Sequence, residues 1–437
     1  MMRSMFSGVS GLRAHQTKMD VIGNNISNVN TVAFKSGRVT FEQVFSQTLQ
    51  GASAPDPLTG RGGTNPMQVG LGINVSTIDT IMTNGSTQRT DNPTDLAIEG
   101  DGFFIVKGGT ADTFRFTRAG NFGIDKAGNL VTGGGLNVYG WQVYSRQPDG
   151  TYVFDTEADI EPINIYEDDT NKNKRTIAAK ATTFAVLAGN LDASNPAVTA
   201  DPDNVQFIIP MTVYDSLGNS YTINLNFWKT ASGADGTTWQ WEATPGSGIS
   251  MGGTASGTFD FDTSGKIDPT TDIKPSITII PPPEAGSEEI EMQLDFSKLT
   301  MYAADSSAKV TSIDGYTSGS LINFSIGPDG VITGIYSNGQ QQPLGLIALA
   351  KFDNPAGLLK SGENLYTPTT NSGDFKKAVR AGTEGVGTLN PGTLEMSNVD
   401  LSYEFTEMIV TQRGFQANSR IITTSDEMLQ ELVNLKR

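Results

Sequence analysis

The sequence has no cysteine among its 437 residues. Disulfide frameworks, thiol catalysis and cysteine-ligated zinc are therefore excluded. It has one histidine, His15, so a metal site built from several histidines is impossible, and a Ser-His-Asp triad would have to use that residue. Basic residues are few, since 30 Lys and Arg stand against 47 Asp and Glu, a formal net charge of -17. The chain thus lacks the overall positive charge of a nucleic-acid-binding protein, and we expect no nucleic-acid partner.

Long apolar runs are absent as well. No stretch approaches the roughly 20 apolar residues that a membrane-spanning helix requires, so we expect no membrane insertion. The N-terminal residues MMRSMFSGVSGLRAHQTK include an early Arg3 but not the uninterrupted apolar segment of a secretory signal peptide. If the protein leaves the cytoplasm, we expect a route that uses no cleaved leader.

The residues that are abundant point to β structure. The chain has 49 glycines and 20 prolines, a composition typical of turn-rich β proteins. Short alternating runs such as FFIV from Phe103 and YTINLNFW from Tyr221 recur together with turn pairs such as Asn84-Gly85. With 37% hydrophobic residues, a chain of this length can build two or three cores. We therefore expect a multidomain, mainly β protein.

The two ends of the chain have helical periodicity instead. Apolar residues recur at alternating steps of three and four, which predicts helices from Ser4 to about Asn28 and from about Val399 to Leu435. Such helices need packing partners, so we expect them to form a coiled coil with each other or with further copies. The predicted seam residues are Met5, Val9, Leu12, Gln16, Met19, Ile22 and Ile26, followed by Leu401, Phe405, Met408, Gln412, Phe415, Ile422 and Leu429.

The first helical pattern runs into an asparagine-rich stretch, NNISNVN, at residues 24–30. Asparagine is a poor helix former because its amide competes for nearby backbone groups, and it tolerates the left-handed backbone found at helix ends. We therefore predict that these asparagines cap and end the helix, while Ile26 and Val29 stay in the seam.

The segment after the helix, residues 30–71, is dense in Gly and Pro and includes GASAPDPLTGRGGTNPMQVGLG. A free linker would not carry so many aromatic residues, among them Phe34, Phe41 and Phe45. We expect an irregular strap that becomes ordered by packing.

Changes in composition near residues 161–175 and 311–320 mark the limits of an inserted domain. The predicted organisation is nested, with discontinuous outer domains around an insertion. Its parts are a terminal helical domain (1–29 and 398–437), the strap (30–71), an outer β domain (72–160 and 312–397) and a middle β domain (161–311).

No catalytic or metal-binding pattern stands out, so we predict a protein that is not an enzyme and has no cofactor. Asp169, Asn171 and Asn173 have the spacing of a calcium loop. However, Lys174 and Lys180 occupy the positions where an EF-hand requires Gly and Glu, which favours a solvated turn and no metal.

A different class of function stays open at this point. Trp228, Trp239 and Trp241 cluster in the middle domain and could form a sugar platform, although core or cross-strand aromatic residues are the favoured interpretation. The alternative is a secreted β-rich carbohydrate-binding or hydrolytic protein, whose terminal helices would be dispensable.

Long stretches of the chain resemble the bacterial flagellar axial proteins, the family of rod, hook and hook-filament junction subunits. SGVSGLRAHQTKMDVIGNNISNVNTVAFKSG (7–37) resembles the N-terminal signature of that family. DLAIEGDGFFIV (95–106) and TRAGNFGIDKAGNLVTGGGLNVYGW (117–141) resemble the outer β domain of its rod and hook members. Residues 394–437 resemble their C-terminal helix. These motifs cover close to half of the chain.

The large inserted domain favours the hook members over the distal rod protein, which is the alternative within the family. The resemblance implies a subunit of a curved tubular homopolymer, a universal joint that transmits torque from rod to filament in the extracellular hook and basal body. It implies export through the flagellar type III apparatus, with the distal rod protein, hook cap and junction protein as further partners. FEQVF, with Phe41, Val44 and Phe45, resembles the element that exported subunits offer to the export gate.

Some family members cross-link through a Cys and a Lys, which a chain without cysteine cannot do. For the polymer we predict a stiff inner tube of helices, sliding contacts at the middle domain and hinging in the strap.

Overall fold

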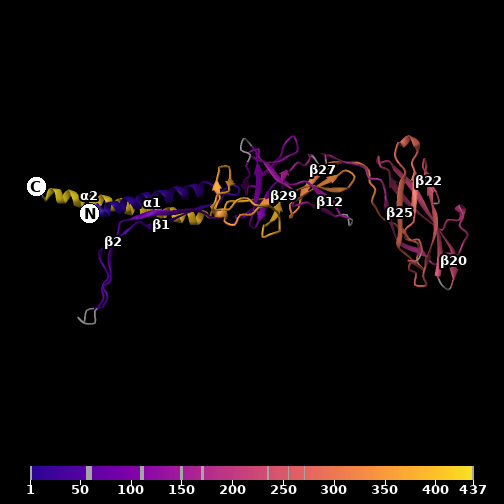
Figure 1. Cartoon of the computed structure of the whole chain (residues 1–437), viewed down its shortest axis with the longest axis horizontal. Helices are drawn as coiled ribbons and strands as arrows, with labels where there is room; N and C mark the ends of the chain where they lie inside the picture. Colours follow the sequence, from indigo (N-terminus) through magenta and orange to yellow (C-terminus); the bar gives the residue numbers. More distant parts are fainter. Residues whose placement is uncertain are drawn as a thin grey trace. The chain divides into compact units, whose positions relative to one another are not determined.

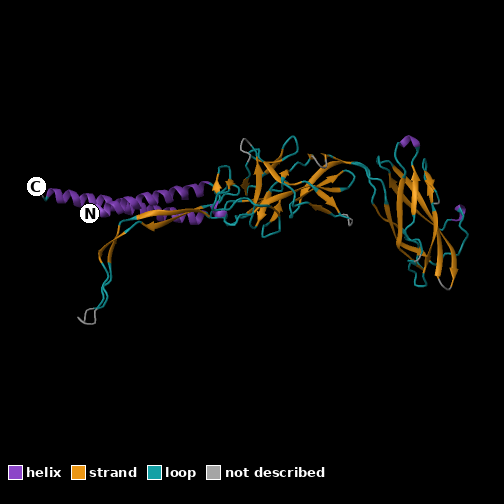
Figure 2. Cartoon of the chain, in the orientation of Figure 1, coloured by secondary structure: helices purple, strands orange, loops and turns teal. Residues whose placement is uncertain are grey.

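A computed structural model describes residues 2–55, 62–108, 113–147, 151–168, 172–233, 236–253, 255–269 and 271–435. It is built mainly of β-strands, with a long helix at each end of the chain (Figures 1 and 2). This confirms the predicted fold class, a mainly β protein with terminal helices. The chain forms two compact units, the first of Met1–Lys172, Ser325–Thr333 and Pro343–Arg437, and the second of Asn173–Phe324 and Gly334–Gln342.

The terminal helices, α1 (Met2–Ser27) and α2 (Leu401–Asn434), pack against each other in the first unit (Figure 1). The carboxylate of Asp400 caps α2, because it accepts hydrogen bonds from the backbone N–H groups of Ser402 at 2.8 Å and Tyr403 at 3.2 Å. Among the described residues, no helix combines the length and the apolar character that crossing a bilayer requires.

The predicted irregular strap is a β-hairpin. β1 (Gly37–Gln43) pairs antiparallel with β4 (Ile73–Thr80), and β2 (Ser46–Gln50) pairs antiparallel with β3 (Met67–Gly70). Between β2 and β3, Ser53 and Thr64 form a further antiparallel bridge. The expected start of the outer domain, residue 72, lies between β3 and β4 and therefore falls inside this hairpin. α1 contacts both β1 and β4.

The end of α1 differs in part from the expectation. The side-chain amide of Asn28 donates to the backbone oxygen of Asn24 at 2.9 Å, so an asparagine does satisfy a carbonyl of the last turn. The left-handed backbone, however, lies at Ala33, with φ of 57°, and at none of the asparagines of residues 24–30. Ala33 is buried, and its N–H donates to the backbone oxygen of Glu395 at 2.8 Å. A long-range contact therefore holds this turn.

The outer β region of the first unit is a sheet with short flanking strand pairs. Its core includes Phe103, Phe116 and Phe352, where the ring of Phe352 meets the other two edge to face at 5.9 and 4.8 Å. The strands of the sheet are β7 (Phe103–Lys107), β8 (Arg115–Thr117), β9 (Phe122–Ile124), β10 (Leu130–Thr132), β11 (Asn137–Trp141), β14 (Glu161–Pro162), β29 (Gln341–Ala350), β30 (Leu359–Lys360), β31 (Leu365–Thr367) and β32 (Ala378–Arg380).

Two strand pairs bring the segment before α2 back to the start of the outer region. β34 (Thr393–Glu395) pairs with β5 (Thr87–Arg89), and β33 (Thr388–Pro391) pairs with β6 (Leu96–Glu99). The remaining strands of this part are β12 (Tyr144–Arg146), β13 (Tyr152–Phe154), β15 (Glu167–Asp168) and β16 (Lys172–Asn173), and the short 3-10 turn η3 spans Pro355–Gly357.

The second unit contains two sheets around one core. One sheet has the order β22-β24-β25-β18-β26 and the other β19-β20-β21-β23. The elements of this unit include β17 (Thr176–Ile177), β18 (Phe184–Asp192), β19 (Phe207–Tyr214), β20 (Ser220–Gly233), β21 (Gly236–Pro245), β22 (Ser250–Gly252), β23 (Ser256–Phe261), β24 (Ser276–Ile280), β25 (Ile290–Tyr302), β26 (Lys309–Ile313) and the turns η1 (Pro202–Asn204) and η2 (Pro283–Ala285).

Trp228, Trp239 and Trp241 belong to the interior of the second unit, since each is at most 2% exposed. The indole N–H of Trp228 donates to the backbone oxygen of Asp201 at 3.0 Å. A sugar platform requires an exposed aromatic face, so the favoured interpretation as core residues holds and the platform is excluded.

The second unit does not coincide with the expected middle domain of residues 161–311. It begins at Asn173 and takes in residues up to Phe324, together with Gly334–Gln342. The strands β27 (Gly319–Ile326) and β28 (Val331–Tyr336) contain points where the chain passes between the units, so the change in composition near residue 311 precedes the structural limit.

Candidate functional site

Small and polar residues make the contact between α1 and α2. Gly8 and Gly11 are buried on α1, and a Cβ atom at position 11 would lie 2.7 Å from the side-chain nitrogen of Asn418. On α2 the residues turned toward α1 recur every seven positions, as Glu404, Thr411, Asn418 and Ser425. The helices therefore approach closely at these glycines, where Asn418 and Ile422 of α2 pack against α1.

Polar contacts set the register of this antiparallel pair. The Ser4 and Ser425 hydroxyls lie 3.4 Å apart at one end. The Lys18 ammonium contacts Glu407 at 2.5 Å nearer the other end. The side-chain amide of Asn25 donates to Glu404 at 2.9 Å, and it also bonds the backbone of Gly37. The asparagine-rich stretch thus joins both helices to the hairpin.

On α1 most of the predicted seam residues lie one position after the residues of this contact, whereas Ile22 is part of it. On α2 four predicted residues that recur every seven positions from Met408 are half-buried, and the other three are exposed. Ile22 is buried, whereas Met5, Leu12, Met19, Ile26, Met408, Phe415, Ile422 and Leu429 are half-buried. Val9, Gln16, Leu401, Phe405 and Gln412 are exposed, so they are not part of the contact within one chain. The face of α1 that carries Gly8 and Gly11 packs closest to α2, and the large residues lie beside that face.

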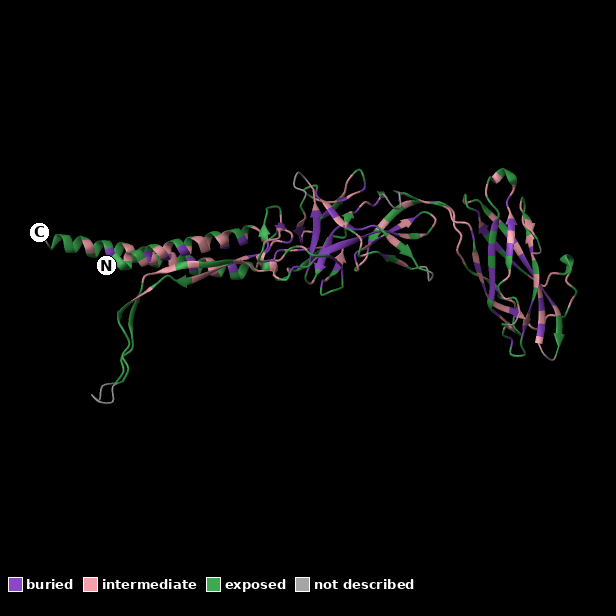
Figure 3. Cartoon of the chain, viewed as in Figure 1, coloured by how far each residue is buried: buried purple, intermediate pink, exposed green. Residues whose placement is uncertain are grey.

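Several large apolar residues of the helix pair are exposed, and we call this set the outward stripe. Figure 3 shows exposed segments along both helices. Phe6 is 66% exposed and Ile409 is 56% exposed. Unpartnered apolar surface of this kind marks an interaction site. The outward stripe consists of Met2, Phe6 and Val9 on α1, and of Leu401, Tyr403, Phe405, Ile409, Val410, Ile421, Met428, Leu432 and Val433 on α2.

His15 lies between three elements. A Cβ atom at Gly414 of α2 would be 2.9 Å from its ring, and the ring of Phe41 in β1 meets it edge to face at 5.7 Å. Its Nδ1 atom is buried and has no hydrogen-bond partner among the described residues. Burial and, second, the nearby Lys18 ammonium lower the pKa of His15 from its ordinary value of 6.5. The helix pair therefore holds a neutral imidazole.

Glu404 is the buried carboxylate of the helix pair. Burial raises its pKa above the ordinary 4.5, and the hydrogen bond from Asn25 opposes that shift. Its pKa therefore shifts in the direction opposite to that of His15.

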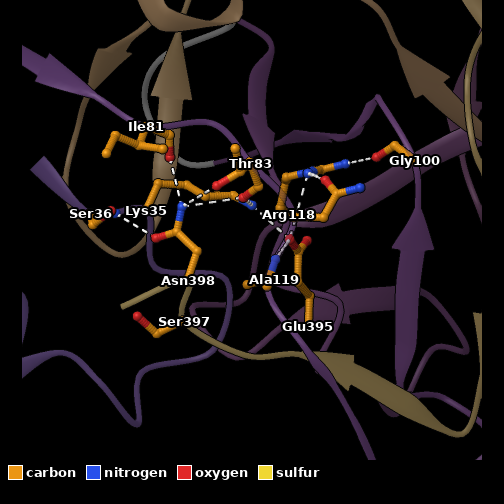
Figure 4. Close-up of polar contacts among 12 residues, drawn as sticks. Lys35, Ser36, Ile81, Thr83, Gly100, Arg118, Ala119, Glu395, Ser397 and Asn398 are labelled. Carbon is orange, nitrogen blue, oxygen red and sulfur yellow. Dashed lines mark hydrogen bonds and ion pairs between the residues drawn. The ribbon is translucent and has the colours of Figure 1, made fainter. Parts of the chain in front are cut away.

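A second cluster, the polar junction, connects the hairpin, the outer sheet and the start of α2 (Figure 4). Its centre is an ion pair at 2.6 Å between Lys35 and Glu395, whose side chains are each 1% exposed. Lys35 also donates to the backbone oxygen of Thr83 at 2.8 Å, and the N–H of Gly85 donates to Glu395 at 3.0 Å. Burial lowers the pKa of Lys35, and the Glu395 carboxylate opposes that shift.

Arg118, directly after β8, is the second cation beside Glu395 in the polar junction. Its guanidinium lies 3.6 Å from the carboxylate of Glu395 and donates to the side chain of Asn84 at 2.6 Å. It also donates to the backbone oxygens of Gly100 and Gly102. One arginine therefore holds the hairpin exit, the outer sheet and the C-terminal segment together.

Asn398 forms the edge of the polar junction beside α2. Its side-chain oxygen accepts from the N–H of Ser36 at 2.8 Å, and its amide donates to the backbone oxygens of Ile81 and Thr83 (Figure 4). Lys360 adds a bond from its ammonium to the backbone oxygen of Lys35 at 2.9 Å. The sequence analysis missed this cluster, because its members are far apart in the chain and share no periodicity.

The residues of the predicted export-gate element lie where β1 ends. Phe41 is half-buried against His15, whereas Val44 is 57% and Phe45 is 63% exposed. Of the residues considered for calcium, Asp169 and Asn171 lie outside the described residues. Within the described ranges, no three His, Asp or Glu side chains gather as a metal ion would require.

Family models match along most of the chain. The first is described as a flagella basal body rod protein and matches residues 5–35. The flagellar hook protein FlgE/F/G D1 domain matches residues 97–184, and the flagellar basal body protein FlaE D2 domain matches residues 190–316. The C-terminal model of the flagellar basal body rod FlgEFG proteins matches residues 390–435.

Curated relatives match over the full length. The chain is 42% identical to the flagellar hook protein FlgE of Borreliella burgdorferi and 40% identical to that of Treponema pallidum, in each case over 100% of both chains. It is 34% identical to the flagellar basal-body rod protein FlgG of Bacillus subtilis, again over the whole of both.

Among solved structures, the Helicobacter pylori flagellar hook protein FlgE2 matches with a TM-score of 0.51 at 15% identity. The match covers 71% of this chain and 100% of that one, and at this identity it bears on the fold alone. The full-length sequence matches carry the assignment, and they exclude the carbohydrate-binding alternative. The chain therefore belongs to the flagellar hook protein family and is a structural subunit of the bacterial flagellar hook.

Proposed function

We propose that the outward stripe is buried between copies when the hook subunits polymerise, so that the helix pairs line the inside of the tube. The observation that carries this proposal is that different residues of the helices form the contact within one chain and the exposed surface. The contact within one chain uses glycine, serine, asparagine and threonine, while large apolar side chains such as Phe6, Phe405 and Ile409 remain exposed. Apolar surface of this kind gains most by leaving water in an assembly.

The seam residues predicted from the sequence divide into two groups under this proposal. Val9, Leu401 and Phe405 are exposed and face neighbouring copies. The half-buried residues, such as Leu12 and Phe415, lie at the flanks of the helix pair, where one side touches the same chain and the other a neighbour. Head-to-tail contacts between identical subunits that do not close give an open helical polymer.

The polar junction fits the transmission of torque. It joins the base of the hairpin, the outer sheet and the segment before α2. The hydrogen bonds to the carboxylate of Glu395 are charge-assisted and therefore stronger than neutral ones, and Asn398 adds a neutral bond to Ser36. The hinge expected in the strap is disfavoured at residues 33–37, because these residues are held by Glu395, Asn398 and Asn25. Bending of the tube would then occur in contacts between outer parts of neighbouring subunits, where wet polar contacts slide at little cost.

Export and neighbours complete the proposal. By the family resemblance, the subunit leaves the cytoplasm through the flagellar type III apparatus without a cleaved signal. The element with Phe41, Val44 and Phe45 would be offered to the export gate, and exposure of the last two residues suits such a role. The distal rod protein, hook cap and hook-filament junction protein would contact the two ends of the polymer.

The outward stripe can be tested with two neighbouring positions on α2. Phe405→Asp places a charge at an exposed apolar position, whereas Thr406→Asp places it at an exposed polar one. The purified full-length variants are driven to polymerise with ammonium sulfate, which favours burial of apolar surface, and polymer is separated by sedimentation.

We expect Phe405→Asp to raise the concentration needed for polymerisation by about 100-fold or more, since burying an unpaired charge costs several kcal/mol. Thr406→Asp should stay close to the unmodified chain, and both variants should keep the circular dichroism of the β units. Polymerisation of Phe405→Asp at the normal concentration would refute the role of the outward stripe.

A further inference from the structure

The two terminal helices differ in length, and the difference is left at one end of the pair. α1 has 26 residues and α2 has 34. In the antiparallel pair Ser4 of α1 meets Ser425 of α2, and α1 begins only two residues before this contact, at Met2. The last two turns of α2, residues 428–434, which we call the α2 overhang, therefore extend past the start of α1.

The chemistry of α2 changes where α1 ends. The series that faces α1 is polar inside the pair, with Glu404, Thr411, Asn418 and Ser425. Its next member, seven residues on, is Leu432, which is 49% exposed. Leu432 and Met428 line a groove of about 360 Å³ with Thr424, Glu427 and Glu431. The face of α2 that contacts α1 is therefore apolar in the part that extends past α1.

The charges at this end are complementary to the beginning of α1. Residues 421–435 include Asp426, Glu427 and Glu431 and no Lys or Arg, although Arg420 precedes this stretch and Lys436 and Arg437, which lie outside the described residues, follow it. Residues 2–19 include Arg3 and Arg13 and no Asp or Glu. The backbone dipoles add to this difference, because a helix N-terminus carries partial positive charge and a C-terminus partial negative charge.

We propose that the α2 overhang of one subunit receives the first turns of α1 from a second copy, with Phe6 and Met2 on Met428 and Leu432, and Arg3 beside Glu427 and Glu431. This inference rests on the proposed burial of the outward stripe and names the partner of one part of it. The α1 helix of the same subunit does not cover the α2 overhang. The contact of Ser4 with Ser425 fixes its position and leaves Met2 67% and Phe6 66% exposed.

The contact joins two different surfaces and leaves one of each free on every new subunit. Such a heterologous contact propagates into an open polymer. It also makes the first turns of α1 and the α2 overhang complementary to each other only between copies.

Charge exchange between copies tests the proposal. The variants Arg3→Glu and Glu431→Arg are purified as full-length chains and polymerised in ammonium sulfate. Each single variant sets like charges against each other, so we expect the concentration needed for polymerisation to rise about tenfold or more. An equimolar mixture of the two should polymerise as the unmodified chain does, because alternating subunits then meet with opposite charges at every contact. The pellet should contain both variants.

A double variant and a matched control make the outcomes decisive. Arg3→Glu with Glu431→Arg in one chain should also recover polymerisation. Arg38→Glu, an exposed charge reversal on the hairpin, should leave it unchanged. The proposal is overturned if the single variants polymerise normally. Recovery by the double variant but not by the mixture would also overturn it, since the contact would then lie within one chain. If the proposed role of the outward stripe is wrong, Phe405→Asp polymerises at the normal concentration, so that outcome is distinguished from failure of the present proposal.

Discussion

Lys35 and Glu395 lie 360 residues apart in the sequence and form an ion pair at 2.6 Å with both side chains buried. Taking two charges out of water is costly, and their attraction repays this only when the geometry and the surrounding hydrogen bonds are good. Thr83 and Gly85 supply such hydrogen bonds, and the guanidinium of Arg118 lies 3.6 Å from the carboxylate of Glu395. The pair therefore joins the two ends of the chain at the base of the helices.

Lys35→Met should destabilise the first unit by about 3–5 kcal/mol, because the carboxylate of Glu395 would stay buried with less compensation. The midpoint of chemical denaturation, followed by tryptophan fluorescence and circular dichroism, measures this loss. The double variant Lys35→Met with Glu395→Met should lose less than the sum of the two single variants. Additive losses would show that the two side chains do not depend on each other.

Gly11→Leu should loosen the helix pair, since a Cβ atom at this position already comes within 2.7 Å of Asn418. Overpacking of this kind costs typically 1–3 kcal/mol. Gly23→Leu is the matched control, because nothing lies within 4 Å of a Cβ atom there, and it should stabilise α1 by up to about 1 kcal/mol through helix propensity. Hydrogen exchange of α1 and α2 measures both effects. Equal protection in the two variants would contradict the close packing at Gly11.

The helix pair should loosen as the pH falls below about 6.5. The pKa of His15 is lowered in the folded chain, so the separated helices bind a proton more readily than the pair does. Stability contributed by the neutral ring is thus complete above about 6.5 and is lost as the pH falls through that value toward the lowered pKa. Lys18, which pairs with Glu407, is the charged group beside the ring.

His15→Gln should remove this loss. The remaining pH dependence then comes from Glu404 and has the opposite sign. Because its pKa is raised in the folded chain, the helix pair becomes more stable as the pH falls from that raised pKa toward 4.5. Hydrogen exchange of residues 8–19 at pH 7 and pH 5.5 compares the two chains. An unchanged pH dependence in His15→Gln would exclude the imidazole as its source.

Phe45→Ala should lower the amount of subunit exported by flagellated cells while leaving its stability within about 0.5 kcal/mol, because the side chain is 63% exposed. Leu49→Ala, at a similarly exposed position on β2, is the control that should be exported normally. Immunoblots of culture supernatants and cell lysates give the ratio. Normal export of Phe45→Ala would remove this residue from the proposed gate element.

The sequence by itself determined the features that depend on local patterns. The terminal helices follow from their apolar periodicity, and the β character of the rest follows from alternating runs and turn pairs. The family follows from long motifs at both ends. These signals are local, because the backbone responds to residues three, four or two positions away.

Only the tertiary structure decided which face of each helix is used within one chain. The spacing of three and four residues predicted Phe405 and Gln412 as seam residues, but Gly8 and Gly11 let the helices approach through Thr411 and Asn418. The closest approach of two surfaces depends on both of them, which no pattern within one segment contains.

The same limit applies to the hairpin and the polar junction. The pairing of β1 with β4 spans a stretch whose composition suggests a loose strap. The position of Ala33 and the burial of Lys35 depend on Glu395, a residue at the other end of the chain. A charge is kept out of water only when its partner is in place, so that part of the molecule is decided by long-range contacts and not by the local sequence.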